Sequence, residues 1–192
     1  MSYFKALLKI GFVLAAILVW SFGARAKPTM QTAVLAAGCF WGVEEFFRKT
    51  PGVISTQVGY TGGEKADPTY DQVSRGTTGH AEAVKIEFDP AKVTYEDLLK
   101  LFFRMHDPTT LNRQGNDVGT QYRSEIFYTT AAQKQTAEKV MKLVSDSKKW
   151  KGPLTTKLEA AGSFYPAEEY HQKYLLKNPK GYDNHYLRDF SF

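Results

Sequence analysis

The chain has 192 residues, a formal net charge of +5 and a single cysteine. A chain of this length suits one domain with a substantial apolar core. One cysteine excludes an intrachain disulfide and a cysteine-cluster metal site. No block of basic residues with interleaved aromatics suggests nucleic acid as a partner.

Residues 1–26 carry a targeting pattern. Lys5 and Lys9 precede an apolar run of about thirteen residues, and Ala24-Arg25-Ala26 follows as a small-x-small cleavage site. This pattern is typical of a secretory signal peptide; an uncleaved membrane anchor is the alternative, although a span needs about 20 apolar residues. Cleavage would remove three bases and no acids, which lowers the charge from +5 to +2. We therefore expect an exported, periplasmic protein whose mature domain is residues 27–192.

The first strand and helix of the mature chain are predicted to meet at Cys39. Residues 31–37 form an apolar run typical of a buried strand. From Phe40 onward apolar residues recur at helical spacing, and Pro51-Gly52 ends the helix. Two acids on its other face precede bases by four positions, the favourable order for ion pairs: Glu44–Arg48 and Glu45–Lys49.

Cys39 would lie at or just before the first turn of that helix. Unpaired N–H groups and the helix dipole favour a thiolate there, so we expect a lowered pKa for this cysteine. Phe40 and Trp41 follow directly and place an apolar aromatic wall beside the sulfur, which suits an apolar, sulfur-bearing substrate. The alternative is a buried structural cysteine. The flanking glycines and the position at a helix start favour the reactive thiol.

The next predicted strand covers residues 53–59, with Ile54, Val58 and Tyr60 on one face. A long polar loop, residues 62–79, follows it. Loops of this length inside a compact domain are usually functional or disordered. Tyr70 is the one large side chain of this loop, at the end of a predicted turn.

Glu82 belongs to the strand predicted over residues 80–88. Period-two alternation places Glu82 on the same face as Val84 and Ile86. A carboxyl group in apolar surroundings has a raised pKa, so it can hold a proton and donate it. The alternative is that Glu82 lies beyond the edge of the core, in water.

The remaining predicted elements complete an α+β fold. They are a helix opened by Thr94 and Asp97 and ended by Asp107-Pro108, a polar loop over 109–119, a strand over 121–129, a helix over 131–147, a strand over 154–160, a helix from Pro166 that carries His171, and an irregular tail from Asn178. The central order is strand, helix, strand, strand, helix, strand. This is the βαββαβ core of a ferredoxin-like α/β plait, with a helix, a strand and the tail appended.

The residue types in the sequence limit the catalytic mechanisms that the protein can use. A cysteine nucleophile needs an activator and a proton donor. His80 and His106 could act as bases, although a lone histidine near a strand or helix end is more often structural. Neither a phosphate loop nor a zinc motif is present, so we expect no metal and no cofactor.

Several motifs closely resemble peptide methionine sulfoxide reductase A, and the resemblance covers about residues 32–182. The matching runs are Gly38-Cys39-Phe40-Trp41-Gly42, Gly59-Tyr60-Thr61-Gly62-Gly63, Gly79-His80-Ala81-Glu82-Ala83-Val84, the run from Gly115 to Ser124, and the run from Phe164 to Gln172. The resemblance implies an oxidoreductase that repairs oxidised methionine under oxidative stress.

The resemblance also implies the roles of individual residues. Cys39 attacks the sulfoxide sulfur, Glu82 protonates the departing oxygen, and the products are methionine and a sulfenic acid on Cys39. The S epimer is the implied substrate, free or in oxidised proteins and peptides. The other implied site residues are Tyr70 and Tyr122 as donors to the oxygen, Phe40 and Trp41 around the methyl group, and Asp117 and His171, which orient the substrate or line the site.

The chain departs from many members of this family in one respect: it has no resolving cysteine. Asp183 follows Tyr182 in the tail, and no second cysteine exists. We therefore expect an external thiol, such as a thioredoxin-like protein, to reduce Cys39 through a mixed disulfide in a monomeric enzyme. Two other classes remain: a thiol peroxidase with the same sulfenic acid, and a non-catalytic module that binds apolar peptides.

Overall fold

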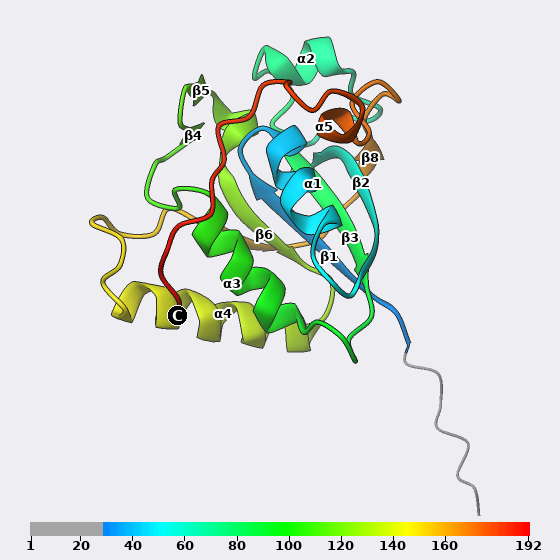
Figure 1. Ribbon diagram of the computed structural model, residues 1–192. Helices are drawn as coiled ribbons and strands as arrows, with labels where there is room; N and C mark the ends of the chain where they lie inside the picture. The colour runs from blue at the N-terminus through cyan, green and yellow to red at the C-terminus, as the bar shows by residue number, and fades with distance from the viewer. Residues whose placement is uncertain (1–28) are drawn as a thin grey trace, which may run out of the picture.

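The computed structural model describes residues 29–192 (Figure 1). The predicted signal peptide or membrane anchor, residues 1–26, lies outside the described residues. Within the described range, none of the helices has both the length and the apolar character of a membrane span. The elements are β1 (Gln31–Ala37), α1 (Phe40–Arg48), β2 (Val53–Thr61), α2 (Tyr70–Ser74), β3 (Ala81–Phe88), α3 (Tyr95–Met105), β4 (Arg113–Gln114), β5 (Asp117–Val118), a short 3-10 helix η1 (Thr120–Tyr122), β6 (Ser124–Tyr128), α4 (Ala131–Asp146), β7 (Lys157–Ala160), β8 (Tyr165–Pro166) and α5 (Tyr174–Lys177).

One sheet of order β7-β6-β1-β3-β2-β8 forms the centre of the fold. Strand β1 pairs antiparallel with both β3 and β6, and β2 pairs antiparallel with β3. These four strands, with α1 and α3, make the predicted plait. Helix α4 then leads to β7, which runs parallel to β6. The predicted α+β fold, with its appended helix, strand and irregular tail, is confirmed.

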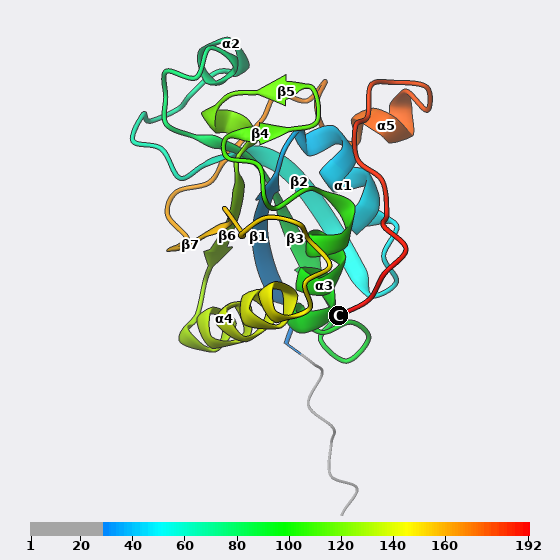
Figure 2. The same cartoon turned by 90° about the vertical axis from the view of Figure 1, so that its left-hand side faces the viewer.

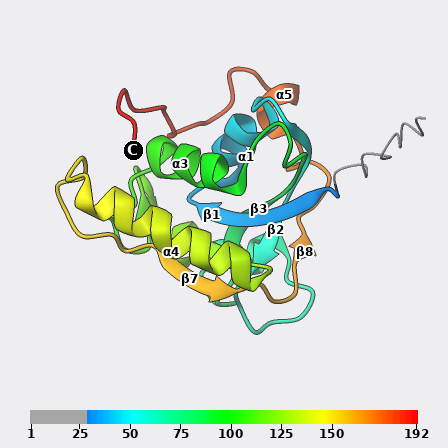
Figure 3. The same cartoon turned by 90° about the horizontal axis from the view of Figure 1, so that it is seen from below.

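Helices α1, α3 and α4 cover one face of the sheet (Figures 1 and 3). The main core lies between them and the strands, and it includes Leu35, Ile86 and Phe102, all fully buried. A smaller cluster on the opposite face packs against Ala161 and Phe164, in the segment between β7 and β8. In Figure 2 the loop segments with α2, β4 and β5 gather at one end of the sheet. That end holds the residues that the sequence indicated as functional.

The prediction for Ile54 is wrong. Its side chain is 59% exposed, whereas Val58 and Tyr60 are fully buried. The cause is a bulge in β2, where the pairing with β3 shifts between Val53 and Ser55. One extra residue in a bulged strand reverses the direction of the side chains beyond it.

The helix predicted to start at Pro166 is also wrong. Pro166 instead pairs with Gly59 as part of the edge strand β8. The segment that follows is held by side chains that bond to distant backbone: Glu168 accepts from the Tyr70 N–H, and Gln172 bonds to the N–H and C=O of Val58. These long-range bonds replace helical ones, so regular helix begins only at Tyr174.

Candidate active site

A cavity of about 130 Å³ lies at the N-terminal end of α1. Its lining residues are Cys39, Phe40, Trp41, Tyr70, Glu82, Asp117, Tyr122 and Tyr182. Seven of the eight site residues expected from the sequence are therefore brought together; His171 lies outside the lining, and Tyr182 was not expected. A larger cavity of about 600 Å³ between β1 and α4 is lined by neither the cysteine nor a carboxyl group. We therefore assign the site to the smaller cavity.

Cys39 occupies the position that the sequence predicts. Strand β1 ends at Ala37, Gly38 turns the chain with a φ of 98° that favours glycine, and Cys39 is the N-cap of α1. The side chain faces the cavity but is only 8% exposed. The sulfur therefore meets a substrate inside the cavity and not on the open surface.

The expected thiolate is wrong for the free protein. Burial raises the pKa of the Cys39 thiol far above its ordinary value, and the charge of Glu82 raises it further, although a hydrogen bond from the Trp41 backbone lowers it. A helix terminus stabilises a charge by about 0.3–1 kcal/mol, which is small beside the cost of removing a thiolate from water. Cys39 therefore rests as a neutral thiol.

Glu82 is the acid that the sequence predicts on the apolar face of β3. It is 2% exposed and accepts a 3.0 Å hydrogen bond from the Phe40 N–H. Burial raises its pKa to about 8; the bond from Phe40 lowers the pKa, and the charge of Asp117 raises it. The alternative position in water is wrong, and the carboxyl group is mostly protonated at neutral pH.

Two phenols face the same cavity. Tyr70 is the first residue of α2, and its N–H donates to Glu168 Oε1 at 2.9 Å. Tyr122 ends the short 3-10 helix before β6. Burial first, and then the charge of Glu82, raises the pKa of both phenols. Both therefore remain neutral hydrogen-bond donors.

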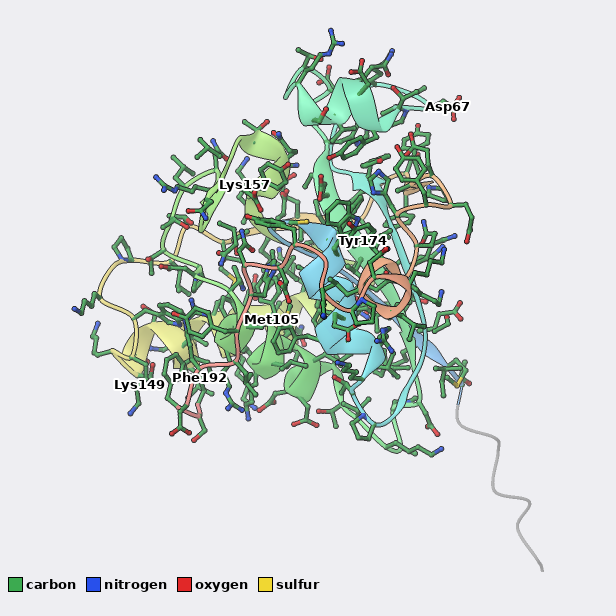
Figure 4. The ribbon with its side chains drawn as sticks, turned by 45° about the horizontal axis from the view of Figure 1, so that its top comes forward. Asp67, Met105, Lys149, Lys157, Tyr174 and Phe192 are labelled. Atoms are coloured by element: carbon green, nitrogen blue, oxygen red, sulfur yellow. The ribbon has the colours of Figure 1, made fainter. Side chains whose placement is uncertain are left out.

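His171 supports the aromatic wall from behind. The Trp41 Nε1–H donates to His171 Nδ1 at 3.0 Å, and the Trp41 ring stacks on Tyr174 at a centroid distance of 3.8 Å. Tyr174, labelled in Figure 4, belongs to α5, which packs beside α1. The His171 ring is 1% exposed and lies 5.1 Å from the Phe40 ring. It thus orients the wall without lining the cavity.

The C-terminal tail closes the remaining side of the cavity. The Tyr182 hydroxyl donates to Asp117 Oδ1 at 3.1 Å, and the Asn184 amide donates to Asp117 Oδ2 at 2.8 Å. Asp117 is therefore held by the tail. Sequence reasoning missed Tyr182 because its partner lies 65 residues away and no local pattern marks the tail.

A neutral thiol at a helix start, a protonated carboxyl group and two phenols around one small cavity define a thiol-dependent oxidoreductase on an α+β plait. Within residues 29–192, no three His, Cys, Asp or Glu side chains gather in a group that could hold a metal ion. Residues 31–190 match the sequence model of a family described as Peptide methionine sulfoxide reductase, and the chain belongs to this family.

Individual relatives are similar along most of the chain. Peptide methionine sulfoxide reductase MsrA of Methanothermobacter thermautotrophicus is 54% identical over 150 residues, which cover 78% of this chain and 89% of that protein. Mxr1 of Saccharomyces cerevisiae in reduced form is 39% identical, with a TM-score of 0.79 and coverage of 83% and 93%. Mxr1 in complex with Trx2 matches with a TM-score of 0.57, 26% identity and coverage of 83% and 91%.

Proposed function

We propose that this reductase converts the S epimer of methionine sulfoxide, free or in peptides and proteins, to methionine through a sulfenic acid on Cys39. The observation that carries the proposal is the shared cavity of Cys39 and the protonated Glu82. A sulfoxide oxygen leaves poorly until it is protonated. A neutral acid and two phenols are therefore the partners that the reaction needs.

The proton movements follow from the two raised pKa values. Glu82 protonates the sulfoxide oxygen, while Tyr70 and Tyr122 donate hydrogen bonds to it. Cys39 attacks the sulfoxide sulfur, the S–O bond breaks, and the thiol proton returns to Glu82. The sulfoxide is reduced by two electrons and the Cys39 sulfur is oxidised by two, as the oxygen passes to it. Because the thiol rests neutral, it loses its proton only when the substrate is bound.

An external thiol completes the cycle. With one cysteine in the chain, the sulfenic acid reacts with a partner thiol to give a mixed disulfide and water, and a second thiol releases Cys39. The solved complex of Mxr1 with Trx2 supports a thioredoxin-like protein as this reductant. The targeting pattern of residues 1–26 supports action outside the cytoplasm, in the periplasm, either as a released monomer or anchored to the membrane.

Single-turnover mass spectrometry tests the reaction. The protein is mixed with a peptide that contains the S epimer of methionine sulfoxide, without reductant, and Cys39 should gain one oxygen while the peptide loses one. The R epimer is the matched control and should react far more slowly. A protein that consumes hydrogen peroxide but leaves the S epimer intact would be a thiol peroxidase. A Cys39→Ser variant that retains its function would indicate a binding module.

N-terminal sequencing of the protein from fractionated cells tests its location. A mature chain that begins near residue 27 in the periplasmic fraction is expected. An intact N-terminus in the membrane fraction would support the anchor.

A further inference from the structure

The tail segment of residues 182–185, here called the strap, holds two sides of the active site at once. Figures 1 and 2 show the tail running past α1 before it reaches α3. Tyr182 and Asn184 bond to Asp117 on β5. His185 bonds instead to Ala37, the last residue of β1, and Asp183 bonds to His185. Alternate side chains of the strap therefore connect β5 to the turn that carries Cys39.

His185 bonds directly to that turn. Its Nε2 lies 2.8 Å from the carbonyl oxygen of Ala37, two residues before Cys39. Its Nδ1 lies 3.1 Å from Asp183 Oδ1, and its main-chain N–H donates to the same oxygen at 2.9 Å. The His185 side chain is fully buried. Each ring nitrogen of His185 therefore lies within hydrogen-bond distance of one oxygen atom.

Asp183 holds the Nδ1 side of the His185 ring. Burial by itself raises the pKa of the carboxyl group, but the hydrogen bonds from the His185 side chain and main chain outweigh burial and lower the pKa overall. The two residues thus form a hydrogen-bonded pair, and the other ring nitrogen of His185 is left to bond to Ala37.

The start of α1 leaves room for this pair. A Cβ atom at Gly42 would overlap the side chains of both Asp183 and His185. A Cβ atom at Gly38 would approach His185 Nε2 to 3.4 Å and would overlap Gln114. Gly38 and Gly42 therefore leave space for the strap, and Gly38 also sets the backbone of the turn before Cys39.

We propose that Asp183 and His185 are a positioning pair for the nucleophile. His185 fixes the Ala37 carbonyl group, Asp183 fixes His185, and together they set the direction of the Cys39 thiol toward the acid Glu82. The pair does not touch the substrate. This inference rests on the proposed reaction at Cys39. It assigns a role to the C-terminal tail, in a chain whose one cysteine is Cys39.

Two amide variants separate the two bonds of His185. In His185→Gln the amide nitrogen replaces Nε2 and keeps the bond to Ala37; in His185→Asn it replaces Nδ1 and keeps only the bond to Asp183. We expect His185→Asn to lower kcat for the S epimer by about 10- to 100-fold, with KM changed less than about twofold. His185→Gln should recover most of that loss. Both variants replace the imidazole ring by a neutral amide, so a difference between them reports which of the two bonds is kept.

The controls make each result decisive. Asp189→Asn, an exposed carboxylate on the same tail, should keep the wild-type kcat. Circular dichroism checks the fold, and Asp183→Ala provides a second measurement should a His185 variant fail to fold; it should lower kcat with KM unchanged. Equal kcat values in His185→Gln and His185→Asn, or wild-type kcat in folded His185→Asn, would overturn the positioning role. Inactive wild-type protein would instead refute the proposed reaction.

Discussion

The main-chain N–H of Phe40 donates a 3.0 Å hydrogen bond to Glu82 Oε2. This bond joins the acid on β3 to the residue that follows Cys39. One contact between the sheet and α1 therefore holds both the proton donor and the nucleophile. Because Oε2 accepts this bond, Oε1 is the oxygen left to carry the proton.

Glu82→Gln tests the acid. The amide keeps the shape of the side chain but cannot release a proton, so kcat at neutral pH should fall by about 10²- to 10⁴-fold. The wild-type rate should decline as pH rises through about 8, where Glu82 ionises, and the variant should lose this alkaline decline. Steady-state kinetics from pH 6 to 10 measure both. An unchanged rate would mean that another group protonates the oxygen.

The stability of the folded protein should also depend on the protonation of Glu82. The pKa of Glu82 is about 8 in the folded protein, against an ordinary value of 4.5. Between these values the folded state holds a proton that the unfolded state releases. The stabilisation from this bound proton is present in full below the ordinary pKa of 4.5 and is lost as pH rises through about 8. The free energy of unfolding should fall by no more than about 1.4 kcal/mol per pH unit. Urea unfolding at several pH values should show this decline in the wild type and a smaller one in Glu82→Gln.

The resting state of Cys39 can be measured by alkylation. Because burial raises its pKa, the rate with iodoacetamide should still be rising at about pH 10, above the ordinary range for a thiol. The urea-unfolded protein is the control and should level off near the pH of a free peptide cysteine. A rate in the folded protein that is constant above about pH 7 would show a thiolate, and the proposed order of proton transfers would be wrong.

Local sequence patterns were sufficient to predict the positions of the two central residues of the site, Cys39 and Glu82. Cys39 lies between an apolar run and a helical repeat, and Glu82 follows the period-two alternation of its strand. The ionisation of the thiol could not be predicted in the same way, because it depends on how deeply the rest of the chain buries the helix start. The strap could not be predicted either. His185 lies 148 residues from Ala37, and its contact depends on how the tail crosses α1.

Trp41→Phe tests the support of the aromatic wall. The substitution keeps an aromatic ring but removes the donor to His171 Nδ1, which leaves a second unpaired nitrogen on a buried ring whose Nε2 already lacks a partner. An unpaired buried polar group costs about 1–3 kcal/mol. We expect that loss in urea unfolding, together with a raised KM for the sulfoxide. Wild-type stability would mean that the His171 ring turns to find another partner.

Two adjacent acids on α1 should differ greatly in their effect on stability. Their spacing predicts two equivalent surface ion pairs, but only Glu45 makes them, with Arg48 and Lys49. Glu44 is 1% exposed and accepts bonds from the Thr56 hydroxyl at 2.9 Å and the Lys173 N–H at 2.7 Å. Glu44→Ala leaves the buried Thr56 hydroxyl and the partly buried Lys173 N–H without this partner.

We expect Glu44→Ala to lower the free energy of unfolding by about 1–3 kcal/mol, the cost of one unpaired buried donor such as the Thr56 hydroxyl. Glu45→Ala should cost less than about 1 kcal/mol, because ion pairs within one helix at the protein surface contribute little and its partners Arg48 and Lys49 can turn to solvent. Urea unfolding of both variants under one condition gives the comparison. Equal losses would show that the contact between α1 and the segment before α5 does not stabilise the fold. A loss confined to Glu44→Ala would show that the buried Glu44 carboxylate links α1 to Lys173. That residue directly precedes Tyr174, whose ring stacks on Trp41.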